Sequence, residues 1–368
     1  MPRVRARAPR ATGRSDHRLP YMGRVNVKPL LEISHLSMHF PVKSGLLRRS
    51  TLVNRAVNDV DLSIYPGETL GLVGESGCGK TTLGRCIARL YQPTHGQIHY
   101  QGVDLASLNQ RALLPYRRDI QMIFQDPMES LNSRHTVKEI LEEPLIIHGV
   151  ASAQARDAEV KRLLDLVGLP ARSATRFPFE FSGGQRQRIG IARAIALKPK
   201  LIVCDEPVSA LDVSIQSQIL NLLLDLQSEF GLAYLFIAHD LAVVKHISDR
   251  IAIMYLGQVV ETAASETIYQ NPRHPYTQSL ISAIPVPDPT SRRQRVILKG
   301  DVPSPIAPPK GCHFHPRCPV CFAPCADHPP LLEPVHESEN HLARCHLINA
   351  SGATEDTGVI ASTLGEVN

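Results

Sequence analysis

Gly74-Glu75-Ser76-Gly77-Cys78-Gly79-Lys80-Thr81 is the segment that decides the fold, because it matches the phosphate-binding pattern G-x-x-x-x-G-K-[ST]. It follows the apolar run Thr69–Val73, which has the length of a buried strand and is too short for a buried helix. The three glycines let the backbone curl so that successive N–H groups point at phosphate oxygens, and the helix that begins near Lys80 adds its positive dipole end. We therefore predict a strand, a loop and a helix that together bind the phosphates of a nucleotide.

Two acidic residues, Asp205 and Glu206, directly follow a second apolar run, Leu201–Cys204. Acids at the end of a buried strand are costly unless they have a function. We predict that Asp205 binds Mg²⁺ through its water shell and that Glu206 acts as the general base on the attacking water. In the phosphate loop, Lys80 is expected to reach the β- and γ-phosphates and the Thr81 hydroxyl to ligate Mg²⁺.

The remaining apolar runs indicate an α/β fold with a parallel sheet that is covered on both faces. These runs are Thr69–Val73, Ile120–Phe124, Leu201–Cys204, Tyr234–Ala238 and Ile251–Leu256. Before them, Leu31–Phe40 and Ala56–Ile64 alternate loosely, as an antiparallel β lead-in does. Chemistry is expected at the carboxyl ends of the parallel strands. His239 directly follows one of these runs, and this position favours a contact of its side chain with the γ-phosphate.

A helical insertion, roughly residues 130–197, ends in Phe181-Ser182-Gly183-Gly184-Gln185 and a basic helix. A backbone nest with a serine hydroxyl at a helix N-terminus is a second anion site. Phosphate loops also occur in GTPases, kinases and helicases, but a monomer with one nucleotide needs only one such site. The second nest therefore separates this chain from those classes.

With these motifs in this order, the chain resembles the ATP-binding cassette (ABC) family over about residues 30–284. Gln125 is similar to the glutamine that senses Mg²⁺ and the transmembrane partner, and His239 to the switch histidine. Phe181–Gln185 resembles the family signature, with Phe where Leu is commoner, and Ser209–Asp212 resembles the D-loop. The resemblance implies a P-loop NTPase cassette that works as a head-to-tail dimer, with each ATP between one phosphate loop and the other signature.

The predicted site residues fall into three groups. We expect catalysis from Lys80, Gln125, Glu206 and His239, and Mg²⁺ binding from Thr81, Gln125 and Asp205. We expect ATP contacts from Phe40, which resembles the aromatic that stacks on adenine, and from Gly74, Glu75, Ser76, Gly77, Cys78, Gly79, Lys80, Thr81, Thr82, Gln125, Ser182, Gly183, Gly184, Gln185 and Asp205.

Two further segments resemble one branch of this family, the oligopeptide/dipeptide importers and their nickel-carrying relatives. They are Asn271–Thr277 with Ser282–Pro285, and Lys299–Pro305. The branch implies uptake of peptides, with nickel or another small solute as the alternative. It also implies two transmembrane permease subunits, a second identical or different ATPase subunit, an extracytoplasmic solute-binding protein as indirect partner, and a peripheral position on the cytoplasmic face of the inner membrane.

Five of the eight cysteines gather in one late, proline-rich segment, which favours metal binding over a disulfide framework. Soft thiolate ligands suit an iron–sulfur cluster or zinc, and spacing alone does not choose between them. The resemblance to the branch favours Cys312, Cys318, Cys325 and Cys345 as ligands of a [4Fe–4S] cluster, with zinc or no metal as alternatives and Cys321 as the spare thiol.

We divide the chain into a disordered basic tail (1–28), the cassette (29–284), a small C-terminal module with the cysteines (285–346) and a disordered tail (347–368); translation starts at Met1 or Met22. The net charge of +5 comes from the arginines before residue 25, so a nucleic-acid-binding face is not expected. No stretch approaches the roughly 18 apolar residues of a membrane span. The other classes considered are a non-transport cassette ATPase and an iron–sulfur regulatory protein with a vestigial nucleotide site.

Overall fold

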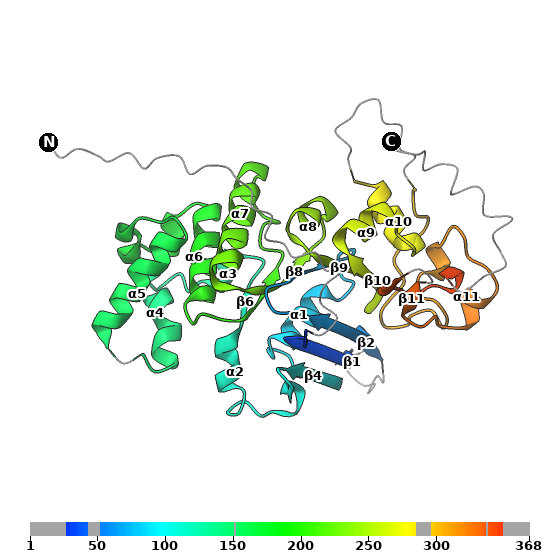
Figure 1. Ribbon diagram of the computed structural model, residues 1–368, viewed down its shortest axis with the longest axis horizontal. Coiled ribbons are helices and arrows are strands. Elements are labelled where there is room, and N and C mark those ends of the chain that lie inside the picture. Colours follow the sequence, from blue (N-terminus) through cyan, green and yellow to red (C-terminus); the bar gives the residue numbers. More distant parts are fainter. Residues whose placement is uncertain (1–26, 43–51, 151, 285–295, 336–337, 349–368) are drawn as a thin grey trace.

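The computed structural model describes residues 27–42, 52–150, 152–284, 296–335 and 338–348 (Figure 1). Most of the two predicted tails, the start of the predicted C-terminal module and both candidate start methionines lie outside the described residues. The predicted domain boundaries therefore stay predictions.

A central sheet of eight strands organises the molecule, in the order β11-β12-β10-β9-β3-β8-β7-β6. Its strands are β3 (Thr69–Val73), β6 (Ile120–Ile123), β7 (Leu201–Asp205), β8 (Ala233–Ala238), β9 (Arg250–Tyr255), β10 (Gln258–Ala264), β11 (Glu333–Val335) and β12 (Ser338–Ala343). The five strands from β9 to β6 are parallel. Every residue of β3, β7, β8 and β9 is buried, which explains their continuous apolar sequence.

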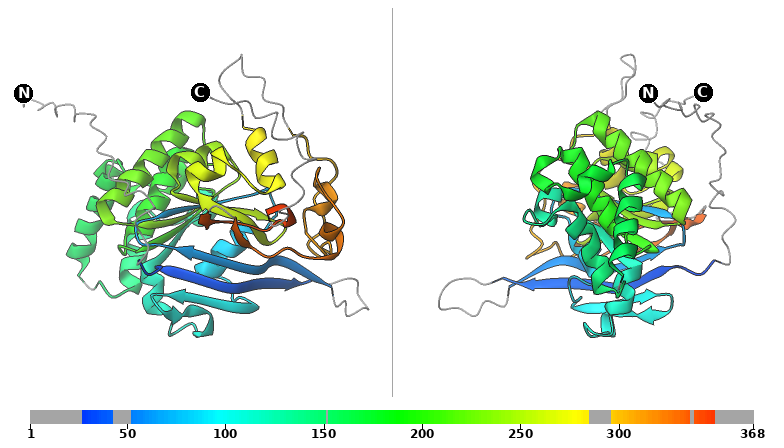
Figure 2. Two further views of the ribbon diagram at one scale, coloured as in Figure 1. Left: turned by 45° about the vertical axis from the view of Figure 1, so that its right-hand side comes forward. Right: turned by 90° about the vertical axis from the view of Figure 1, so that its left-hand side faces the viewer.

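A second, antiparallel sheet lies beside the central one, in the order β2-β1-β4-β5 (Figure 2). Its strands are β1 (Leu31–Pro41), β2 (Val53–Ile64), β4 (His95–Tyr100) and β5 (Val103–Asp104). One hydrophobic core joins the two sheets, and it includes Leu31, Leu70 and Leu83. Helix α1 (Lys80–Ile87) contacts strands of both sheets, so the predicted phosphate loop is anchored between them.

The helical insertion contains α3 (Pro127–Ser130), α4 (Val137–Ile147), α5 (Ala153–Leu166) and α6 (Gly183–Ile195). Thr136 and Glu139 form a reciprocal capping box at the start of α4, and the Ser152 hydroxyl caps α5. The other helices are α2 (Leu114–Asp119), α7 (Val213–Phe230), α8 (Leu241–Ile247), α9 (Ser265–Gln270), α10 (Pro275–Ser282) and α11 (Pro324–Asp327). Among the described residues, none of these helices has the length and apolarity to cross a membrane.

Part of the C-terminal segment pairs with the central sheet. Strand β12 pairs with β10, with Glu261 opposite Ala343 and Thr262 opposite Leu342, so it extends the central sheet. The buried carboxylate of Glu261 lies 2.7 Å from Nε2 of His341 and accepts the backbone N–H of His274 at 2.9 Å. These contacts fix the C-terminal strands and the start of α10 to one side of the sheet.

Candidate nucleotide site

Parallel pairing brings the predicted catalytic residues to one edge of the central sheet. Val73, the last residue of β3, pairs with Ala238 at the end of β8, and Asp205 of β7 pairs with Ile237. Glu206 and His239 follow these strand ends, and Gln125 lies two residues beyond β6. The carboxyl ends of four adjacent strands thus meet where the phosphate loop begins, as expected for this kind of sheet.

The phosphate loop has a backbone that requires glycine at two positions. Gly79 has a φ of 107°, and a Cβ atom there would lie 2.0 Å from the carbonyl oxygen of Ala56. At Gly74 a Cβ atom would lie 2.1 Å from the carbonyl oxygen of Met254. Gly79 also precedes α1 without a side-chain cap, so the first N–H groups of the helix remain available to an anion.

Lys80 and Thr81 both form hydrogen bonds at the edge of the sheet where the nucleotide is expected to bind. The Lys80 ammonium is buried and donates to the carbonyl oxygens of Gly74 at 2.7 Å and Glu75 at 2.9 Å. The Thr81 hydroxyl donates to Oδ1 of Asp205 at 2.8 Å. Burial raises the pKa of the Asp205 carboxyl, and the Thr81 hydrogen bond opposes this shift. A hydroxyl and a buried carboxylate side by side are suitable oxygen ligands for Mg²⁺, which would neutralise phosphate charge when bound.

Glu206 is the centre of a second group of polar side chains. Gln125 donates its amide to Oε2 of Glu206 at 2.9 Å, and Nδ1 of His239 lies 3.4 Å from the same oxygen. Glu206 itself has a φ of 45°, and its backbone N–H donates to the carbonyl of Ile237 on β8. A non-glycine residue in this region is uncommon and is typical of functional positions. Gln125 and His239, which are predicted to catalyse hydrolysis with Glu206 and Lys80, therefore both contact Glu206.

The predicted signature begins a different helix, away from the phosphate loop (Figure 1). Ser182 caps α6: its hydroxyl accepts the N–H of Gln185 at 3.4 Å, and the Gln185 side chain accepts the N–H of Ser182 at 3.1 Å. Ser182 and Gly183 are exposed, whereas a Cβ atom on Gly184 would lie 2.5 Å from Ile215 of α7. The predicted second anion site thus opens to solvent on the helical insertion.

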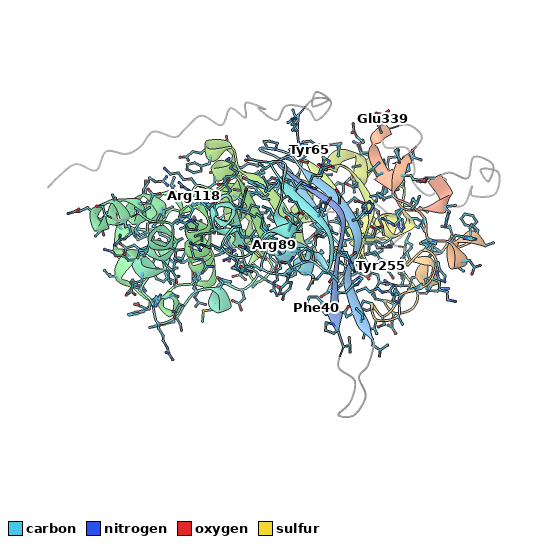
Figure 3. The ribbon with its side chains drawn as sticks, turned by 90° about the horizontal axis from the view of Figure 1, so that it is seen from below. Phe40, Tyr65, Arg89, Arg118, Tyr255 and Glu339 are labelled. Atoms are coloured by element: carbon cyan, nitrogen blue, oxygen red, sulfur yellow. The ribbon has the colours of Figure 1, made fainter. Side chains whose placement is uncertain are left out.

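The remaining predicted contact residues surround the loop. Phe40, near the end of β1 (Figure 3), packs edge-to-face on Tyr91 with ring centroids 5.7 Å apart. Ser76 and Gly77 are exposed, Cys78 is buried, and Thr82 is half-buried in the first turn of α1. Burial raises the pKa of the Cys78 thiol, in keeping with a small apolar side chain. The contacts of these residues with ATP stay predictions.

Two contacts to Glu75 were not predicted from the sequence. Its N–H donates to the Tyr276 hydroxyl at 2.9 Å, and its carboxylate accepts two hydrogen bonds from the Arg317 guanidinium at 2.8 and 3.1 Å. Tyr276 belongs to the Asn271–Thr277 segment and Arg317 lies between Cys312 and Cys318. Both segments had been singled out, but nothing in their spacing indicates contact with a loop more than 200 residues earlier.

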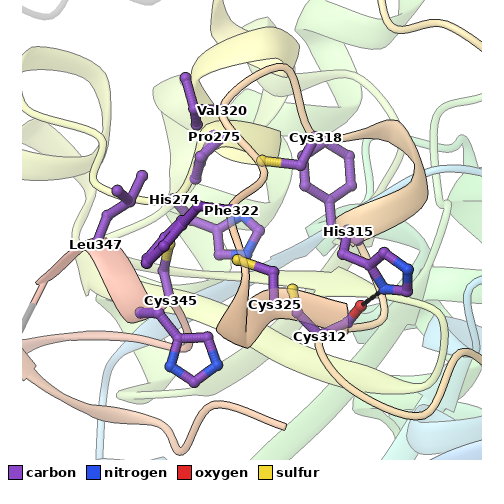
Figure 4. A pocket seen from close by; sticks show the side chains of 12 residues that line it. His274, Pro275, Cys312, His315, Cys318, Val320, Phe322, Cys325, Cys345 and Leu347 are labelled. Carbon is purple, nitrogen blue, oxygen red and sulfur yellow. Dashed lines mark hydrogen bonds between the residues drawn. The ribbon is translucent and has the colours of Figure 1, made fainter. Parts of the chain in front are cut away.

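The four predicted cysteine ligands line one cavity, together with His274 and Phe314 (Figure 4), while Cys321 is exposed. The volume of the cavity in which the centre of a water molecule could lie is about 10 Å³. Burial raises the pKa of the thiols of Cys312, of Cys318 to about 11 and of Cys345 to about 12, which favours the protonated form.

A bound metal finds little support in this arrangement. One zinc ion needs sulfur atoms about 3.8 Å apart. Among the described residues, the only three His, Cys, Asp or Glu side chains with ligand atoms all within 4.8 Å of one another are His35, Asp59 and Asp61, on the exposed part of the antiparallel sheet. The four thiols do not have the spacing of a single-ion site, and the [4Fe–4S] cluster is not supported.

A nucleotide-hydrolase site on a parallel sheet, with a second anion site on a helical insertion, defines an ATP-binding cassette. The model of the ABC transporter family matches residues 57–209, and that of the oligopeptide/dipeptide transporter C-terminal region matches residues 260–325. The chain is 50% identical to the oligopeptide transport ATP-binding protein AppF of Bacillus subtilis, over 89% of this chain and 99% of AppF. It is 52% identical to the putative oligopeptide transport ATP-binding protein YkfD of the same species, over 87% of this chain and 95% of that protein. The chain belongs to the ABC transporter family, in the branch of the oligopeptide transport ATP-binding proteins.

Solved structures agree with this fold. The dimeric, post-hydrolysis structure of the cassette MJ0796 bound to ADP and Pi superposes with a TM-score of 0.57 at 31% identity, covering 64% of this chain and 98% of that one. The structure of cbiO1 from Clostridium perfringens, part of the cbiONQ complex, has the same TM-score at 23% identity, covering 66% of this chain and 91% of that one. The predicted cassette fold is confirmed.

Proposed function

We propose that this chain hydrolyses ATP to energise the import of peptides across the cytoplasmic membrane. The observation that carries the proposal is the meeting of Lys80, Asp205 and Glu206 at one sheet edge, with Gln125 and His239 in contact with Glu206. Lys80 binds phosphate, Asp205 and Thr81 hold Mg²⁺, and Glu206 takes the proton of the attacking water. Gln125 and His239 orient the Glu206 carboxylate toward that water.

Hydrolysis in this proposal requires two cassettes that face each other. The exposed nest at Ser182 and Gly183 begins a helix in a different part of the molecule from Gly79 and Lys80. It therefore cannot bind a phosphate that Gly79 and Lys80 of the same chain hold. A second cassette in the opposite orientation would supply the missing site, and the similar cassette MJ0796 has a dimeric structure. The second subunit is a copy of this chain or a homologous ATPase.

The solute is proposed from the relatives, because the cassette itself does not contact it. AppF and YkfD are named for oligopeptide transport, and a relative from Sinorhizobium fredii at 50% identity is a probable peptide ABC transporter ATP-binding protein. The experiment is uptake of labelled di- to pentapeptides and of nickel into vesicles that contain the whole transporter. Peptide-dependent ATP turnover supports the proposal, and nickel-dependent turnover alone would replace it with the nickel alternative.

A groove on the helical insertion supports two permease subunits as partners. It has a volume of about 290 Å³, and the residues of α4 that line it are Glu139, Glu142, Glu143, Ile146 and Ile147. The two isoleucines are 55% and 59% exposed, and they give the groove an apolar end that a permease segment could cover. A permease segment bound there would hold the chain on the cytoplasmic face of the membrane. A solute-binding protein would join on the opposite side.

The metal at Cys312, Cys318, Cys325 and Cys345 remains a separate proposal. It is supported by the convergence of these four thiols, and not Cys321, on one cavity. Iron, sulfide and zinc analysis of protein purified without oxygen tests it. One zinc per chain without iron would select zinc, and the absence of all three would remove the metal.

A further inference from the structure

We propose that Arg317 is a positioning residue for the phosphate loop: it fixes the Glu75 side chain and cancels its charge beside the bound phosphates. The inference rests on ATP binding at this loop, as proposed above. It assigns the C-terminal segment a role in the ATP site that is independent of any metal.

The contact has the geometry of a strong ion pair. Arg317 donates from both terminal nitrogens to the two carboxylate oxygens of Glu75, at 2.8 and 3.1 Å. The Arg317 side chain is only 9% exposed and that of Glu75 30% exposed, so water screens the pair less than it would on the surface. The guanidinium also lies over the ring of Tyr255, at 5.9 Å from its centroid (labelled in Figure 3).

The backbone N–H, the backbone carbonyl and the carboxylate of Glu75 are all hydrogen-bonded. Besides the two bonds to Arg317, its N–H donates to Tyr276 and its carbonyl accepts from Lys80 at 2.9 Å. Tyr276 packs on Tyr255 and Phe314, with ring centroids 4.7 and 5.4 Å away. The residue that accepts the Glu75 N–H is therefore fixed in an aromatic cluster. Phe314 and Arg317 belong to the same short C-terminal turn. That turn therefore contacts the phosphate loop through Arg317, and through Phe314 it packs on Tyr276, the residue that accepts the Glu75 N–H.

The sign of the electrostatic effect follows from the charges. A carboxylate on the phosphate loop without a partner would repel the phosphates of ATP. Arg317 offsets this repulsion by neutralising Glu75. Loss of Arg317 should therefore weaken ATP binding, and removal of the Glu75 charge in the same molecule should restore it.

The test compares variants of the full chain by calorimetric ATP binding. We expect Arg317→Ala to weaken binding about tenfold at about 0.05 M salt, the scale of one charge-assisted hydrogen-bonded pair, and less at about 0.5 M, where charges are screened. The double variant Glu75→Gln/Arg317→Ala should bind within about threefold of wild type. Wild-type affinity of Arg317→Ala, or no recovery in the double variant, would overturn the proposal.

A matched control is available on the surface of α5. Arg162 makes a similar two-bond pair with Glu159, at 2.9 and 2.6 Å, far along the chain from the phosphate loop. Arg162→Ala should leave ATP binding unchanged, and an equal loss in this variant would show that the Arg317 effect is not specific. In the assembled transporter, Arg317→Ala should raise KM for ATP and leave kcat within about twofold; loss of kcat at unchanged KM would contradict a positioning role.

Two further variants separate the possible failures. Thermal unfolding checks that Arg317→Ala is folded. If it is not, Arg317→Gln replaces it, and its ATP affinity supports or overturns the proposal in the same way. Lys80→Ala is measured beside them. If wild type does not bind ATP, the proposed function fails; if wild type binds, Lys80→Ala does not and Arg317→Ala is normal, only the role of Arg317 fails.

Discussion

Replacing Glu206 by Gln separates catalysis from binding, because Glu206 and the neighbouring Asp205 have different contacts. Asp205 is 1% exposed and bonds to Thr81, whereas Oε2 of Glu206 lies 2.9 Å from the Gln125 amide and 3.4 Å from His239. Gln keeps the length of the side chain and an oxygen that can accept from Gln125. It cannot take a proton from water. The phosphate and Mg²⁺ contacts should therefore be unchanged.

The expected loss of turnover is about 10² to 10⁴-fold, which is the contribution of a well-placed general base. This corresponds to about 2.7 to 5.5 kcal/mol in the activation free energy. ATP turnover is measured in the assembled transporter, ATP affinity by calorimetry, and the trapped dimer by size-exclusion chromatography with ATP. We expect turnover to fall in this range, ATP affinity to stay within about threefold, and the cassettes to remain associated while ATP is bound.

Asp240→Asn is the matched control, because Asp240 also follows a strand of the same sheet. Its carboxylate caps α8 by accepting the N–H of Ala242 at 2.7 Å, and Asn caps helices about as well as Asp does. This variant should turn over ATP near the wild-type rate. Turnover of Glu206→Gln within about tenfold of wild type would refute the assignment of Glu206 as general base.

Three other predictions concern the two anion sites. Lys80→Ala should abolish measurable ATP binding by calorimetry, because it removes the buried ammonium of the phosphate loop, and unchanged binding would remove the loop from the site. Ser182→Ala should leave ATP binding to the isolated chain intact but lower hydrolysis in the complex; loss of binding to the isolated chain would contradict the facing dimer. Gly79→Ala should lower the melting temperature more than Gly77→Ala does, because both have positive φ but only Gly79 would place a Cβ atom against backbone, 2.0 Å from a carbonyl oxygen. Equal shifts in the two melting curves would mean that the loop relaxes without strain.

Most of the catalytic edge could be predicted from the sequence, because local pattern and parallel pairing are sufficient to place it. The run Thr69–Val73 is strand β3 as predicted, and Leu201–Cys204 is β7 with one more residue, Asp205. Parallel strands in register then bring their carboxyl ends together wherever the residues lie along the chain. For this reason Glu206 and His239 could be grouped before their contact was seen.

The C-terminal half of the site could not be predicted in this way. Strand β12 has the sequence Ser338-Glu339-Asn340-His341-Leu342-Ala343, which lacks an apolar run or a clear alternation. Its place is set by a buried bond from His341 to Glu261, and that of Arg317 by its bond to Glu75 across 242 residues. Such pairs depend on tertiary packing, and no rule of period or spacing indicates them. The cysteine pattern shows the same limit: in the part of the chain that the structure describes, no three thiols have their sulfur atoms all within 4.8 Å of one another.

The pairing of β10 with β12 also affects how the protein is made. Glu261 and Thr262 leave the ribosome about 80 residues before Ala343 and Leu342, their partners in the finished sheet. At ordinary rates of synthesis, this interval lasts about 4 to 16 s. Once β9 pairs with β10, the backbone N–H and C=O groups on the other side of β10 have no strand to pair with until β12 is made. Every nascent chain therefore passes through a period with an open sheet edge, which is the surface that promotes aggregation between neighbouring chains.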